Sequence, residues 1–100
     1  MSPASWAFAR RISSRASESD RDKIVFAFRS CVARYPEQSE LDMLVRTYKA
    51  ELKRFLEDPH KARTLVGNNE IPDGVPVEQY AAWFFVANIL LNLDETITKN

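Results

Sequence analysis

The stretch that decides the fold is Tyr80–Leu93, Tyr-Ala-Ala-Trp-Phe-Phe-Val-Ala-Asn-Ile-Leu-Leu-Asn-Leu, the most apolar run of the chain. At the roughly 100° per residue of an α-helix, apolar side chains cover most of its circumference. The main apolar face holds Tyr80, Trp83, Phe84, Ala87, Leu90 and Leu91, flanked by Ala82, Val86, Leu93 and Ile97 on one side and by Phe85 and Ile89 on the other. Only Asn88, Asn92 and Glu95 form a polar stripe. Such a helix must be buried among neighbours, so we expect it at the centre of the fold.

This run is too short to cross a membrane. It spans residues 80–93 and contains two asparagines, whereas a transmembrane helix needs about 20 apolar residues. The opening Met-Ser-Pro-Ala-Ser-Trp-Ala-Phe-Ala-Arg-Arg has its charges after its apolar part, which is the reverse of the order in a secretory signal. We therefore expect neither a membrane span nor a signal peptide.

The rest of the chain also has the pattern of helices. Its only two glycines, Gly67 and Gly74, fall in one loop, and apolar residues elsewhere recur with a period near 3.6. The pattern predicts five helical segments, at about Ala4–Ala16, from Ser19 to Pro36, from Ser39 to Leu56, from Asp58 to Gly67, and from Pro76 to about Ile97.

This prediction rests on signals for helix starts and on one long apolar stripe. Ser19 and Ser39 are each followed three residues later by an aspartate, a pattern close to a capping box. Asp58 before Pro59 predicts another start, because proline suits the first helical position. The third segment has the clearest apolar stripe, comprising Leu41, Leu44, Val45, Tyr48, Leu52, Phe55 and Leu56. We expect that stripe to face the core.

Composition bounds the class of protein. One hundred residues with 45% hydrophobic and 28% charged residues fit one globular domain. The net charge is zero, which argues against nucleic acid as a partner. Residues 1–50 hold nine basic and six acidic residues, and residues 51–100 hold five and eight, so the halves carry +3 and −3. Either the halves attract each other in the fold, or a basic face on the first helix meets a partner.

The chain has few residues that could catalyse a reaction or bind a metal. His60 and Cys31 are the only histidine and cysteine, too few for a usual metal site. The chain has no haem-attachment motif, no nucleophile elbow and no phosphate loop. Cys31 falls on an apolar stripe, as a small hydrophobe would. We predict no enzyme activity, no catalytic or metal site and no cofactor.

One carboxylate on the central helix needs a partner. Asp94 lies at the same helical angle as Trp83 and Leu90, near a helix C-terminus where the dipole disfavours negative charge. Either it forms an internal ion pair with a basic helix, or it is presented to a partner domain. The candidate cations are Arg10, Arg11, Arg29 and Arg34.

Two further groups are candidates for interaction. Arg10, Arg11 and Arg15 could bind phosphate or an acidic partner at low specificity, or could simply be solvated. Asn88 and Asn92 could bond across a protein interface or could satisfy the backbone of a neighbouring loop.

Three segments of the sequence resemble a known family. Its helix–helix corner, Gly-Arg-x-Pro-Thr followed by Glu-Leu, is matched here by Arg34, Pro36, Glu40 and Leu41, while Ala33 and Glu37 depart from it. The run Arg21, Ile24, Ala27-Phe28-Arg29 and the ending Ala81-Ala82-Trp83, Val86-Ala87, Leu90–Glu95 and Ile97-Thr98 are also similar. From about Ala9 to Asn100 the chain thus resembles the C-terminal domain of large planctomycete-type exported proteins, which often begin with a cytochrome-c-like haem domain. The resemblance implies no catalytic residues, and the haem motif is absent here.

We therefore predict an all-α fold, a small bundle of four to five helices with the C-terminal helix central. Residues 1–100 are expected to form a single helical domain, the C-terminal fragment of a larger multidomain protein. The resemblance implies a non-catalytic packing module of an exported protein, whose partners are that protein's other domains. The alternative is a stand-alone helical interaction domain that binds a protein partner or forms a homodimer.

Overall fold

The computed structural model describes the backbone of residues 3–15 and 17–99, and the side chains of residues 4–15 and 17–93. Over these residues the fold is all-α, as predicted. The helices are α1 (Pro3–Ser13), α2 (Asp20–Cys31), α3 (Gln38–Glu57), α4 (Pro59–Val66) and α5 (Val77–Lys99). No strand occurs in this part of the chain.

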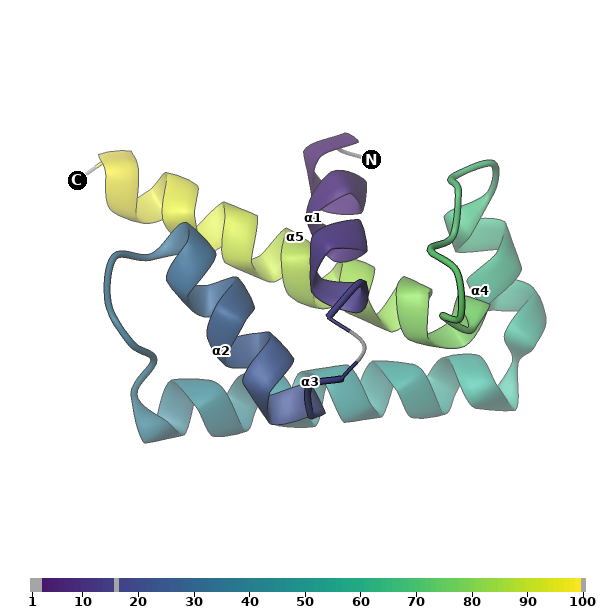
Figure 1. Ribbon diagram of the computed structural model, residues 1–100, viewed down its shortest axis with the longest axis horizontal. Helices are drawn as coiled ribbons and strands as arrows, with labels where there is room; N and C mark the ends of the chain where they lie inside the picture. The colour runs from purple at the N-terminus through teal and green to yellow at the C-terminus, as the bar shows by residue number, and fades with distance from the viewer. Residues whose placement is uncertain (1–2, 16, 100) are drawn as a thin grey trace.

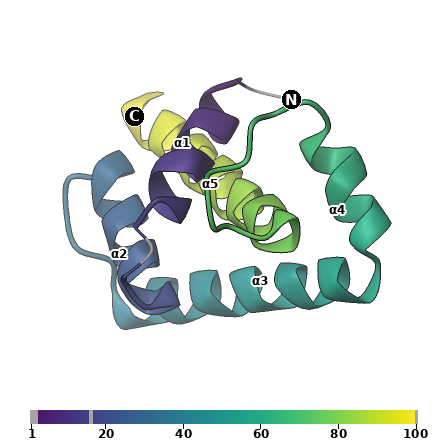
Figure 2. The same ribbon diagram turned by 45° about the vertical axis from the view of Figure 1, so that its right-hand side comes forward.

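Helix α5 lies at the centre and contacts all four other helices. Figure 1 shows α1 crossing it, α2 in front of it, α3 running along the lower edge and α4 beside its first half. Figure 2 shows the N-terminal half of α5 end-on, enclosed by α1, α3 and α4. The prediction of a central C-terminal helix is confirmed, with α4 joining the first three helices around it.

Stacked aromatic rings form the middle of the core. The Trp83 ring of α5 is fully buried and stacks on the Tyr48 ring of α3, with centroids 3.8 Å apart. Trp6 of α1 stacks on Phe84 of α5 at 4.3 Å. The Tyr80 hydroxyl donates a hydrogen bond to the Trp6 carbonyl oxygen at 3.3 Å, and burial raises the pKa of Tyr80. Three helices are therefore held together through one ring system on α5.

Three predicted helix boundaries are confirmed. Ser19 is the N-cap of α2, and its hydroxyl accepts a hydrogen bond from the Asp22 amide at 3.1 Å. Pro59 takes the first position of α4, although Asp58, its N-cap, makes no side-chain capping bond. Gly67 ends α4 with a φ of 57°, in the left-handed region that favours glycine.

Other local predictions were wrong. Helix α3 begins two residues before its predicted start, with Glu37 rather than Ser39 as the N-cap, because Glu37 and Glu40 form a complete capping box. Helix α2 ends at Cys31, well before its predicted end at Pro36. The next residue, Val32, is extended and stops the helix. Leu56, expected in the core, is 59% exposed, because it stands at the edge of the stripe near the end of α3.

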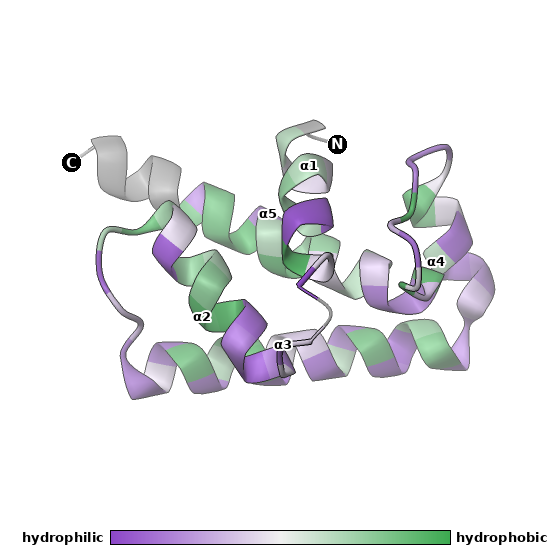
Figure 3. Ribbon diagram, in the orientation of Figure 1, coloured by the Kyte–Doolittle hydropathy of each residue, from purple (hydrophilic) through white to green (hydrophobic). Residues whose placement is uncertain are grey.

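Most of the described ion pairs join residues that lie near each other in the sequence. Figure 3 shows hydrophilic residues concentrated on α3 and on the loop after α4, whereas the coloured part of α5 is mostly hydrophobic. Among the described side chains, the Arg10–Glu70 pair at 3.9 Å joins the two halves of the chain. The other ion pairs lie within one half: Arg15–Glu18, Arg21–Asp42, Arg34–Glu40 and Arg54–Glu51. The opposite charges of the halves therefore do not meet mainly through ion pairs.

We predict that Trp83→Ala lowers the free energy of unfolding by about 3–5 kcal/mol, since it empties the ring site on which Tyr48 stacks. Urea denaturation followed by circular dichroism measures this loss. Trp83→Phe should cost clearly less, because the buried indole Nε1 has no hydrogen-bond partner among the described residues. Met43→Ala, at an exposed position, is the control and should change stability by no more than about 0.5 kcal/mol.

Candidate functional site

The corner between α2 and α3 is built around a charged pair. The Arg34 guanidinium donates to both oxygens of Glu40, at 2.8 and 2.9 Å, and Glu40 Oε1 also accepts the Glu37 amide at 2.8 Å. The Arg34 guanidinium lies 5.1 Å from the centroid of the buried Phe28 ring. The guanidinium and the Glu37 amide together lower the pKa of Glu40 to about 2. Arg34 is therefore a structural residue of the corner. From the sequence it is also a candidate cation for Asp94.

Arg10 also has an internal contact. Its Nη1 donates to the Glu70 carbonyl oxygen at 3.2 Å, and its Nη2 lies 3.9 Å from the Glu70 carboxylate. Both side chains are largely exposed, so the ion pair itself is weak. The contact ties the loop after α4 to α1.

The two asparagines of α5 differ in environment. Asn88 Oδ1 accepts a hydrogen bond from the Ser5 hydroxyl at 3.0 Å, which links α5 to α1. The described partner of Asn88 is thus a side chain of another helix, and its role at a protein interface stays a prediction. Asn92 is exposed on α5. The side chain of Asp94 lies outside the described residues, so its pairing with an arginine stays a prediction.

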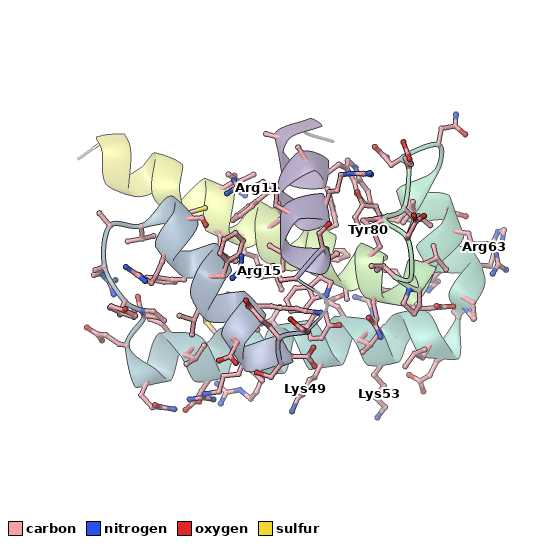
Figure 4. The ribbon with its side chains drawn as sticks, viewed as in Figure 1. Arg11, Arg15, Lys49, Lys53, Arg63 and Tyr80 are labelled. Atoms are coloured by element: carbon pink, nitrogen blue, oxygen red, sulfur yellow. The ribbon has the colours of Figure 1, made fainter. Side chains whose placement is uncertain are left out.

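Arg11 and Arg15 gather around one aromatic ring. The Arg15 guanidinium lies 4.0 Å from the centroid of Phe26, and the Arg11 guanidinium lies 5.7 Å from the same centroid and 5.8 Å from that of Phe8. Figure 4 shows both arginines between α1 and α2. Arg15 also bonds Glu18, which lowers the pKa of that carboxyl. Such stacking orients a guanidinium while leaving N–H groups at its edge.

The ring contacts of this region were missed from the sequence. Phe26 lies outside the apolar stripe of α2, which comprises Ile24, Ala27, Phe28 and Cys31, and it is half-buried. An aromatic residue off the stripe, with arginines on the preceding helix, was the signal that could have revealed the stacking. Farther along α2, the Arg29 guanidinium lies 4.1 Å from the ring centroid of Tyr35, which is 66% exposed.

Two shallow hollows adjoin these arginines and share Ser30. The larger encloses about 460 Å³ and is lined by Arg15, Glu18, Asp22, Val25, Phe26, Arg29 and Ser30. The smaller encloses about 270 Å³ and is lined by Ala4, Ala7, Phe8, Arg11, Ser30, Cys31 and Leu91. We call the smaller one the α1–α2 cleft. It brings Arg11 to an otherwise mostly apolar surface.

The remaining residues that could react or bind a metal lie apart from one another. His60 is exposed at the start of α4, and Cys31 is half-buried at the end of α2. Within residues 4–15 and 17–93, no three side chains of histidine, cysteine, aspartate or glutamate gather as a metal site would require. The described helices include none with the length and apolarity needed to cross a membrane. No family model, curated protein or solved structure matches the chain.

We predict that Glu40→Gln destabilises the protein at pH 7 and that the difference from wild type shrinks as the pH falls. The folded pKa of Glu40, about 2, lies below its ordinary value of 4.5, so its stabilisation is present above pH 4.5 and is lost as the pH falls to about 2. Urea midpoints measured across that range test this.

The substitution removes the charge and one of the two oxygens that accept from Arg34 but keeps the cap, because the remaining glutamine oxygen can still accept the capping bond from Glu37. Glu40→Ala removes both the pair and the cap and should destabilise more. Glu70→Gln, at an exposed ion pair, is the matched control. A difference between Glu40→Gln and wild type that stays constant from pH 7 to pH 2 would contradict the pKa argument.

Proposed function

We propose that the chain is a non-catalytic helical packing module that docks onto other domains of a larger exported protein. The observation that carries the proposal is an apolar stripe on α5 that the other helices leave partly uncovered. It consists of Phe85, Ile89 and Leu93 at four-residue spacing, where the flank of Phe85 and Ile89 meets the flank of Leu93 on the side of the helix opposite the main apolar face. We call these residues the α5 stripe.

The α5 stripe starts at the edge of the core and continues away from it. Phe85 is half-buried, with its ring centroid 6.0 Å from that of Phe55 on α3. One turn later Ile89 is 36% exposed, whereas the adjacent Leu90 is fully buried. Leu93 is half-buried and Asn92 beside it is exposed. Apolar side chains on the open side of a central helix are suited to a protein contact.

The resemblance supports a role as scaffold. Arg34, Glu40 and Leu41 are among the residues shared with the family, and here they form the salt-bridged corner and the buried start of α3. Shared residues that hold a fold together, rather than a constellation of reactive groups, suit a module that packs and does not catalyse.

We predict that the isolated wild-type chain binds an apolar dye or self-associates at high concentration, and that Ile89→Lys reduces both. Because Ile89 is partly exposed, the variant should keep its helicity and lose little stability. Dye fluorescence and size-exclusion chromatography with light scattering measure these effects. Leu56→Lys makes the same charge change at an exposed leucine on α3 and should leave dye binding unchanged.

The same measurements separate the alternatives. A wild-type chain that is a clean monomer and binds no dye would contradict docking through the α5 stripe. A discrete dimer that already forms at low concentration and that Ile89→Lys dissociates would instead favour the stand-alone, homodimeric interaction domain. An open reading frame that continues upstream of Met1 into a related coding region would support the larger protein, and an in-frame stop beside a ribosome-binding site would oppose it.

A further inference from the structure

We propose that the α1–α2 cleft binds an acidic amphipathic segment of a protein partner. The cleft goes beyond the proposed docking role, because it lies on another side of α5 from the α5 stripe. Leu91 contributes to the cleft and Ile89 to the stripe, and residues two apart on a helix point in nearly opposite directions.

The floor and walls of the cleft are apolar. Figure 1 shows α1 and α2 diverging in front of α5. Ala4, Ala7 and Phe8 come from α1, and Leu91 comes from α5. The small alanine side chains are exposed and let another chain approach closely. A groove between helices with an apolar floor can take the apolar face of a bound helix.

The charge at the cleft selects an acidic partner. Among the described residues that line it, Arg11 alone is charged, and Arg11 forms no ion pair with any side chain that the structure describes. Arg29, which lines the adjoining hollow next to the shared Ser30, likewise has no carboxylate partner among the described residues. Both guanidiniums are oriented by aromatic rings, so the N–H groups of each can donate two hydrogen bonds to one carboxylate with little further ordering.

The adjoining hollow supplies a contrast in charge. Arg15 there is bonded to Glu18, and Asp22 adds a second negative charge to the lining. Attraction for an acidic segment is therefore concentrated at Arg11 and Arg29. Two arginines without a carboxylate partner among residues 4–15 and 17–93, in a chain of zero net charge, match a few carboxylates better than a nucleic-acid backbone, which needs a row of cations.

The probe is a fluorescein-labelled helical peptide of about 14 residues, or roughly four turns, with leucines on one face and glutamates on the other. Fluorescence anisotropy with the whole chain at low salt should show saturable binding that weakens as salt is added. Arg11→Ala and Arg29→Ala should each raise Kd about fivefold, equivalent to about 1 kcal/mol. Ala7→Trp should abolish binding by filling the cleft from its α1 wall.

The controls are an arginine removed far from the cleft and a peptide without its negative charges. Arg63→Ala removes an exposed arginine from α4 at the other end of the molecule (Figure 4) and should leave Kd unchanged. A peptide with glutamines in place of glutamates should bind at least about fivefold more weakly. Ile89→Lys should not alter peptide binding, so loss of docking through the α5 stripe and loss of this site are distinguishable. Circular dichroism verifies that each variant is folded.

Several outcomes would overturn the proposal. These are no binding of the glutamate peptide by wild type, equal affinity for the glutamine peptide, or an Arg63→Ala effect as large as that of Arg11→Ala. Tighter, Arg11-dependent binding of a single-stranded oligonucleotide or of phosphatidylglycerol vesicles would assign the cleft to a different class of ligand.

Discussion

Burial of the apolar circumference of α5 is the constraint on which the structure depends. Trp83 lies at its middle, stacked on Tyr48 at 3.8 Å, with the Lys23 ammonium 5.7 Å from the indole ring. A single helix cannot cover such a surface, so α1, α3 and α4 pack around it and α2 completes the enclosure. Burial together with the nearby charge of Asp20 raises the pKa of Tyr48, which keeps the phenol neutral inside this stack.

Around that core, arginines are held by rings as well as by carboxylates. Arg34 does both, since it bonds Glu40 and lies over Phe28, and it thereby connects the corner to the core. Arg11 and Arg29 rely on rings alone among the described contacts. The distinction has a consequence for function. A salt-bridged arginine has used its directional hydrogen bonds, whereas a stacked one keeps them for a partner.

The long-range features of the fold were predictable where periodicity was strong. The apolarity of Tyr80–Leu93 predicted the central helix, and the stripe of Leu41, Leu44 and Tyr48 predicted the inner face of α3. The competition between residues for the N-cap position of a helix was harder to foresee. Ser39 is a good N-cap by residue type, but Glu37 and Glu40 satisfy each other's backbone amides, and Arg34 neutralises Glu40, so the helix begins earlier. The site was least predictable, because stacking on Phe26 depends on where α1 and α2 meet.

The two proposed surfaces have different relations to the family resemblance. The corner and most of α5 fall within the similar region, which runs from about Ala9 to the end of the chain. The α1 wall of the cleft includes Ala4, Ala7 and Phe8, which precede that region. The α1 wall of the cleft therefore lies outside the residues that carry the resemblance. Binding proposed at the cleft rests on its own lining and on the charge of Arg11, whereas docking proposed through the α5 stripe also draws on the resemblance.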